Sequence, residues 1–264
     1  MRLIKLGGSV ITRLDPTESF DAENLTRLAS ELKGLEHGTV LVHGTGHIGK
    51  PYAAEYGFLA DGLISADQTN LIAEIKSALR NLNARVVEIL VASGVPAFAA
   101  SPASFFDSCM KDFRQDNLIR DLTDQLEQKC VPVFYGDLMP LPDGRHQVFS
   151  SDRIMAILAR RLMPRQVIFL TDVPGVFGRD EHGKRAERPM RELTRGRMDE
   201  VFQGQSDAVD VSGGMQAKIR LAIEIASNTD ECVIASGVEE GVLAALLSGQ
   251  PVACTKLIGD AQSA

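Results

Sequence analysis

Lys5 lies near the end of a short apolar run at the N-terminus, and two glycines and a serine follow closely (K-L-G-G-S, residues 5–9). An ammonium group beside exposed backbone N–H groups suits a bound oxyanion, because both kinds of donor stabilise its negative charge. A strand followed by an ordinary turn would contain the same residues, so this motif alone does not choose between the two interpretations.

A second glycine-rich stretch, H-G-T-G-H-I-G-K at residues 43–50, follows the apolar run that ends at Val42. Glycines in such a turn let backbone amides approach an anion closely. The stretch therefore raises two questions: whether it is a phosphate site, and if so, whose phosphate Lys50 meets.

Three further motifs are ambiguous when each is taken alone. Gly213 and Gly214 open a helical pattern, and Lys218 follows one turn later, where its ammonium would meet a phosphate at the helix N-terminus. Asp152 begins another helical pattern, either as an acidic residue stabilised by the helix dipole or as a carboxylate that organises lysines. The stretch T-D-V-P-G-V (171–176) is either an ordinary turn or a turn that accommodates a nucleotide.

Short apolar runs alternate with helical periodicity along the chain, which predicts a mainly parallel sheet covered by helices. Ligands of such sheets bind at the carboxyl ends of the strands, where the glycine-rich turns fall. A charge-dense surface excursion with a hairpin near residues 180–183 is expected over 178–208. Helices are expected over residues 21–34, 65–94, 150–162 and 210–228, and strands in the runs at 3–11, 38–44, 96–101, 131–137, 165–177 and 231–237, the last of which ends the series.

Composition limits the classes of protein to which this chain can belong. The 264 residues include 44% hydrophobic and 24% charged residues, as is ordinary for a globular chain, and the net charge of −7 argues against non-specific binding to nucleic acid. No run reaches transmembrane length and the N-terminal apolar run is too short for a secretory signal, so we expect a cytoplasmic protein without a membrane partner. The four cysteines form no C-x-x-C pair and are expected to be buried free thiols.

The order of the motifs is more specific than any one of them. K-x-G-G-S, a strand ending in H-G-x-G, a G-D pair, S-x-D, T-D-V-x-G-V and G-G-M-x-x-K together resemble the amino acid kinase superfamily over nearly the whole chain. The pattern is most similar to the branch that holds isopentenyl phosphate kinases and fosfomycin-resistance kinases. The chain lacks the Walker A pattern of P-loop kinases.

This resemblance implies an α/β fold, a three-layer α/β/α sandwich with a mainly parallel central sheet, in a single domain over residues 1–264. About residues 1–150 would bind a small-molecule phosphoryl acceptor, and about residues 151–264 would bind ATP with Mg²⁺. Because members of the superfamily are commonly homodimers, we also expect a homodimer.

The resemblance also assigns roles to the residues that match the motifs. The catalytic residues would be Lys5, which contacts the transferring phosphoryl group, Lys218, and Asp152, which holds the lysines in place. The nucleotide would be bound by Gly7, Gly8, Ser9, Gly46, Thr171, Asp172, Gly213, Gly214 and Lys218. The acceptor would be bound by Gly44, Thr45, His47, Gly49, Lys50 and Ser151. No side chain is assigned as a metal ligand.

Lys50 is a departure from the resembled branch, where a histidine at the corresponding position grips the phosphate of the acceptor. Three interpretations stay open. Lys50 replaces the histidine and binds a phosphate, phosphonate or carboxylate; or His47 takes over that role; or the acceptor has no phosphate and Lys50 is a solvated surface residue.

The leading functional hypothesis is an ATP-dependent kinase that transfers the γ-phosphoryl group to a phosphate or phosphonate acceptor, such as isopentenyl phosphate or a fosfomycin-like compound. The alternatives are a kinase of a carboxylate or alcohol, or a nucleotide-binding sensor without turnover. Apolar residues of the expected helix after the glycine loop either pack in the core or line a pocket for a hydrocarbon tail, and sequence does not separate these cases; they are Leu71, Ile72, Ile75 and Leu79.

Overall fold

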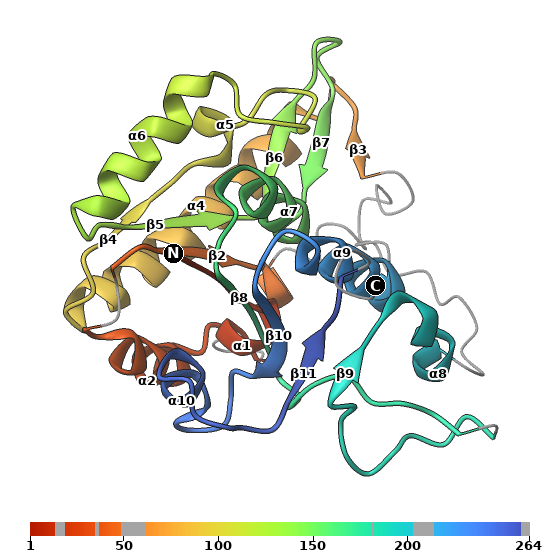
Figure 1. The fold of residues 1–264 in the computed structure, drawn as a ribbon. Coiled ribbons are helices and arrows are strands. Elements are labelled where there is room, and N and C mark those ends of the chain that lie inside the picture. The colour runs from red at the N-terminus through yellow and green to blue at the C-terminus, as the bar shows by residue number, and fades with distance from the viewer. Residues whose placement is uncertain (14–18, 35–36, 49–61, 181, 203–213, 260–264) are drawn as a thin grey trace.

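An eight-stranded, mainly parallel sheet forms the centre of the computed structural model, which describes residues 1–13, 19–34, 37–48, 62–180, 182–202 and 214–259 (Figure 1). The strand order is β4-β5-β2-β1-β8-β10-β11-β9. All neighbours pair in parallel except β10 and β11, so β11 and β9 run opposite to the other six strands. The strands are β1 (Arg2–Leu6), β2 (Thr39–His43), β4 (Ala97–Ala99), β5 (Val131–Tyr135), β8 (Gln166–Thr171), β9 (Glu192–Leu193), β10 (Glu231–Ser236) and β11 (Cys254–Leu257).

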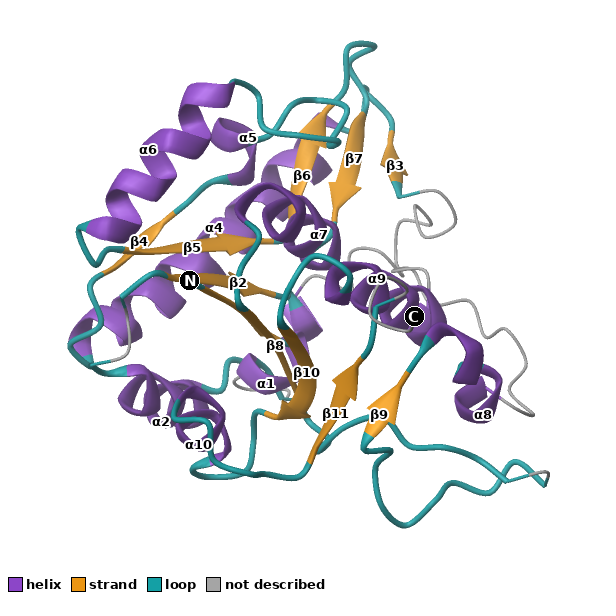
Figure 2. Ribbon diagram, viewed as in Figure 1, coloured by secondary structure: helices purple, strands orange, loops and turns teal. Residues whose placement is uncertain are grey.

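Helices cover both faces of this sheet, which confirms the expected three-layer α/β/α sandwich (Figure 2). Successive residues of β1 point to opposite faces: Leu3 belongs to one buried cluster, together with residues 122–126, 154–159 and 219–226, and Ile4 belongs to the other, together with residues 25–32 and 242–247. Such double burial explains why the central strands read as continuous apolar runs. The helices are α1 (Gly8–Ile11), α2 (Ala22–Leu32), α4 (Thr69–Ala92), α5 (Pro102–Phe105), α6 (Asp116–Glu127), α7 (Ser151–Leu162), α8 (Asp199–Phe202), α9 (Gly214–Ala226) and α10 (Val242–Leu247), with a 3₁₀ turn at Arg195–Arg197.

A small antiparallel sheet, which the sequence analysis missed, stands beside the N-terminal part of α4. It consists of β3 (Leu63–Ile64), β7 (His146–Phe149) and β6 (Asp137–Pro140), in that order. These strands are two to four residues long, too short to show the alternation that identifies a strand. A third apolar cluster, distinct from the two main ones, fills the space between this sheet and α4; its members are Ile64, Leu71, Ile72, Ile75, Leu79, Tyr135 and Leu138.

Several expected boundaries differ from the structure. The strand series does not end with β10, because β11 returns antiparallel beside it. The long helix begins at Thr69 instead of residue 65. The surface excursion contains the expected hairpin, with a bridge between Arg179 and Arg185, but it also contributes β9 to the sheet.

The four cysteines are free, as expected, but only Cys232 is fully buried and Cys109 is exposed. Among the described residues, no helix combines the length and the apolar character that crossing a membrane requires.

Candidate active site

The carboxyl ends of the central strands meet at one edge of the sheet. Parallel pairing places Leu6 opposite both His43 and Leu170, and Ser236 opposite Thr171. The turns after β1, β2, β8 and β10 are therefore neighbours. This edge is where ligands of parallel sheets bind, since each strand there gives way to a turn.

The turns after β1 and β2 touch through their backbones. A Cβ on Gly8 would lie 2.4 Å from the nitrogen of Gly46, and one on Gly44 would lie 2.7 Å from the nitrogen of Gly8. Gly46 also has a φ of +50°, which favours glycine. These glycines are thus required for the two turns to approach each other, a role that the sequence analysis did not anticipate.

Thr12 locks the two turns together, and sequence reasoning missed it. Its hydroxyl donates to the carbonyl oxygen of Gly8 at 2.7 Å and accepts from the backbone N–H of His47 at 3.0 Å. The side chain is buried. No local pattern marks this threonine, because its second partner lies 35 positions further along the chain.

Lys5 and Asp152 form a salt bridge between β1 and the first turn of α7. Only 12% and 14% of these side chains are exposed. Ser150 caps α7 by accepting from the N–H of Arg153 at 3.2 Å, which fixes the start of the helix and with it the direction of Asp152. The ammonium of Lys5 also lies 5.9 Å from the ring centre of Phe169 on β8. The expected neighbourhood of Lys5 and Asp152 is therefore present.

Ser9 and Asp172 connect the turns after β1 and β8. The hydroxyl of Ser9 donates to Asp172 Oδ1 at 3.0 Å. The side chain of Thr171 instead donates to the carbonyl of Val173 at 2.8 Å and so shapes the turn itself. Of the expected nucleotide-site residues, the structure brings Gly7, Gly8, Ser9, Gly46, Thr171 and Asp172 to this edge.

Lys218 lies in the second turn of α9 and is half-buried. Because α9 packs against α7, the helices that carry Lys218 and Asp152 are neighbours. Gly214 begins α9. Gly213, Gly49 and Lys50 lie outside the described residues, so the three interpretations of Lys50 stay open.

Thr45 and Ser151, two expected acceptor residues, both approach Gly136 in the turn after β5. A Cβ on Gly136 would lie 3.4 Å from Thr45 Cγ2 and 3.4 Å from the nitrogen of Ser151. Ser151 is the first residue of α7 and is buried, whereas His47 is half-buried. The glycine loop and the start of α7 therefore face each other across Gly136.

A buried imidazole, His43, ends β2 directly before the glycine loop. Its Nδ1 lies 2.9 Å from the carbonyl oxygen of Gly44, and its Nε2 lies 3.1 Å from the amide nitrogen of Asn83. The first contact needs a proton on Nδ1 and the second needs a lone pair on Nε2, so the ring is neutral. Burial lowers the pKa of His43 to about 4, against the opposing effect of the hydrogen bond to Gly44.

Asp137 places a buried carboxylate beside the third apolar cluster. Its Oδ1 accepts from the N–H of Leu138 at 2.8 Å and lies 3.6 Å from Lys76 Nζ. Burial, together with the charge of Asp137, raises the pKa of Tyr135. Burial and the positive charge of Lys76 lower the pKa of His146.

The described residues contain no group of three His, Cys, Asp or Glu side chains that could hold a metal ion. Mg²⁺ carried on phosphates is commonly bound through one or two carboxylates together with substrate oxygens, and Asp152 and Asp172 are carboxylates at this edge. The ammonium of Lys5 and the glycine-rich turns fit the phosphates themselves.

Comparison with known proteins agrees with this geometry. The amino acid kinase family model matches residues 1–236. An isopentenyl phosphate kinase of Methanothermobacter thermautotrophicus is 32% identical, covering 98% of this chain and 99% of that protein. The isopentenyl phosphate kinase of Methanocaldococcus jannaschii is 28% identical, over 83% of this chain and 85% of that one. A solved structure of an isopentenyl phosphate kinase, 29% identical, superposes with a TM-score of 0.77 over 97% of this chain and 99% of its own.

The family match and the kinase relatives identify the chain as a phosphotransferase. The chain belongs to the amino acid kinase family.

Proposed function

We propose that this protein is a kinase that uses ATP with Mg²⁺ and transfers the γ-phosphoryl group to a small acceptor that already carries a phosphate, with isopentenyl phosphate as the first candidate. The salt bridge between Lys5 and Asp152 at the carboxyl edge of the sheet carries this proposal. Its support from relatives is the 32% identity to an isopentenyl phosphate kinase over nearly the full length of both chains.

The residues at this edge supply what phosphoryl transfer requires. The transition state needs in-line alignment and neutralisation of spread negative charge, and it needs no covalent intermediate. Lys5 would place an ammonium on the transferring group, and Asp152 would hold that ammonium in one position. Lys218 would supply a second positive charge, and the turns at Gly8 and Ser9 would supply backbone donors. ATP with Mg²⁺ would bring the phosphoryl group and part of the neutralising charge.

A phosphate acceptor also explains why no general base is required. An ionised phosphate oxygen is already a competent nucleophile, so no side chain has to remove a proton from it. His43 would be unsuited to such a role, because both of its ring nitrogens are engaged with Gly44 and Asn83.

A hydrocarbon tail on the acceptor would lie next to the third apolar cluster, whose residues pack together in the core. This cluster lies beside the start of the glycine-rich stretch, since its member Tyr135 stacks on His43 with ring centres 5.9 Å apart. Ile72 and Ile75 of α4 are buried within this cluster, so the structure places them in the core. We propose that residues up to about 150 hold the acceptor, that the remainder holds the nucleotide, and that the protein forms a homodimer.

A coupled assay of ADP release tests the proposal. The purified chain with MgATP is offered isopentenyl phosphate, dimethylallyl phosphate, fosfomycin, other phosphonates, and several carboxylates and alcohols. We expect turnover with isopentenyl phosphate, a loss of kcat on the order of a hundredfold in Lys5→Ala, and no change in the exposed-lysine control Lys111→Ala.

Two results would contradict the proposal. Turnover only with acceptors that lack phosphorus would assign the chain to a different substrate class within its family. Binding of ATP without turnover of any acceptor, and without a difference between wild type and Lys5→Ala, would identify a nucleotide sensor.

A further inference from the structure

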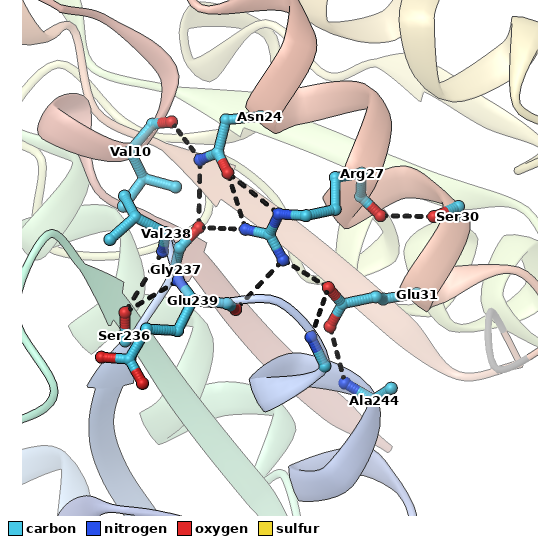
Figure 3. Close-up of polar contacts among 11 residues, drawn as sticks. Val10, Asn24, Arg27, Ser30, Glu31, Ser236, Gly237, Val238, Glu239 and Ala244 are labelled. Atoms are coloured by element: carbon cyan, nitrogen blue, oxygen red, sulfur yellow. Dashed lines mark hydrogen bonds and ion pairs between the residues drawn. The ribbon is translucent and has the colours of Figure 1, made fainter.

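Three polar residues on one face of α2 join segments that are distant in sequence. Asn24, Arg27 and Glu31 contact α1, the turn after β10 and the start of α10 (Figure 3). We call these three residues the α2 clamp. None of them belongs to the motifs considered above, and the hydrophobic residues of α2 face the core instead.

Asn24 uses every hydrogen-bonding position of its amide. Its Nδ2 donates to the carbonyl of Val10 in α1 at 2.8 Å and to the carbonyl of Gly237, after β10, at 3.0 Å. Its Oδ1 accepts from Arg27 Nη2 at 2.6 Å and Nε at 3.1 Å. These partners fix the orientation of the amide, because a flipped amide would place its oxygen against two carbonyl oxygens.

Arg27 likewise has an acceptor for each of its five N–H groups. Besides the two contacts with Asn24, Nη2 donates to the carbonyl of Gly237 at 2.6 Å, and Nη1 donates to the carbonyl of Glu239 at 3.2 Å and to the carboxylate of Glu31. A lysine has three donors on one nitrogen and cannot reproduce this planar arrangement.

Glu31 extends the network to α10. Its Oε1 accepts from the N–H of Gly241 at 3.1 Å, and its Oε2 accepts from the N–H of Ala244 at 3.0 Å. The carboxylate thus caps a helix from another segment while it neutralises Arg27. The segment from Gly237 to Ala244 is therefore held at both ends by α2.

The α2 clamp closes a ring of contacts that runs through the expected nucleotide-site residues Ser9, Thr171 and Asp172. The N–H of Gly237 donates to the carbonyl of Thr171 at 2.7 Å, and Asp172 accepts from Ser9 at the start of α1. Asn24 completes the ring, since it binds both Gly237 and Val10 of that same helix. Gly237 has no room for a side chain, because a Cβ there would lie 2.9 Å from side-chain atoms of Leu170 and Val10.

We infer that Asn24 and Arg27 are positioning residues for phosphoryl transfer: they set where α1 lies relative to the turns after β8 and β10, and so where Gly8, Ser9 and Asp172 meet the phosphates. This inference rests on the proposed function. The donors at this edge stabilise a transition state only when they are held in place, and small displacements lower kcat steeply.

Asn24→Asp is the most direct test, because it keeps the size of the side chain and an oxygen for Arg27 but removes both donors. We expect kcat per folded enzyme to fall about tenfold or more, with the KM of the acceptor within about twofold of wild type. Arg27→Lys should give a smaller loss than Arg27→Ala. Arg165→Ala is the matched control, since Arg165 is exposed and forms a surface ion pair with Asp230 at the opposite end of β8.

Hydrogen exchange of the α1 amides gives a second measurement that is independent of the acceptor. The N–H groups of Val10 and Thr12 bond to Gly7 and Gly8, and both should exchange faster in Asn24→Asp than in wild type or in Arg165→Ala. Unchanged exchange at these amides would overturn the inference. So would a lowered Tm with wild-type kcat and KM, because that result would mean a purely structural role. A wild-type protein that turned over no acceptor would contradict the proposed function. The inference about Asn24 and Arg27 would then be tested by hydrogen exchange of the α1 amides and by the affinity for MgATP.

Discussion

Replacing His43 by glutamine removes a buried imidazole whose protonation the fold opposes. The pKa of His43 is lowered from 6.5 to about 4 by burial. Between these two pH values the unfolded chain binds a proton that the folded protein does not bind. The free energy of unfolding therefore falls as the pH falls through this window, and the contribution of His43 to stability is complete above about pH 6.5.

The expected size of the effect follows from the same two pKa values. One pKa unit corresponds to about 1.4 kcal/mol, so the loss attributable to His43 is roughly 2 kcal/mol at pH 5 and approaches roughly 3 kcal/mol below pH 4. The physical cause is local: a proton on Nε2 would face the amide of Asn83, which now donates to that nitrogen at 3.1 Å. Turning the amide over would break its 3.3 Å contact with the carbonyl of Val133.

Urea unfolding followed by far-UV circular dichroism measures this effect, and the chain has no tryptophan for fluorescence. We compare wild type, His43→Gln and the exposed-histidine control His37→Gln at pH 7.5 and pH 5. The glutamine variant should lose about 2 kcal/mol less than the other two proteins between these pH values. Equal losses in all three proteins would refute the reasoning and show that His43 titrates normally or that its environment relaxes.

Three further predictions concern the salt bridge of Asp152, the close approach of Gly8 to Gly46, and the oligomeric state. In Asp152→Asn, Lys5 would lose its charged partner. The free energy of unfolding, measured by urea titration, should therefore fall by about 1–3 kcal/mol. The kcat, measured by ADP release, should fall as well. Gly8→Ala should lower the free energy of unfolding in urea by about 1–3 kcal/mol, because its Cβ would lie 2.4 Å from the backbone of Gly46. Gly196→Ala is the control, because its Cβ would lie 4.0 Å from Thr194 Oγ1 and would not clash. Light scattering after gel filtration should give the mass of a dimer, and a mass near 28.6 kDa would contradict that expectation.

Much of the central layer could be predicted from local pattern alone. The apolar runs that became β1, β2 and β8 are buried on both faces, and each is followed by glycine or by Thr-Asp where the chain must turn. Such signals depend only on neighbouring residues, so a single sequence displays them. Local pattern did not predict the small sheet of β3, β6 and β7 or the returning strand β11, because such short strands contain too few residues to show a period.

Only the tertiary structure brings the residues of the candidate active site together. Lys5 and Asp152 are 147 positions apart, and Ser9 and Asp172 are 163 positions apart. No periodicity specifies such pairs, because they depend on the order of strands in the sheet and on which helices cover each face. The same reason explains why Thr12, Asn24 and Arg27 could not be recognised beforehand: their chemistry is ordinary, and only the crossing of distant turns gives them partners.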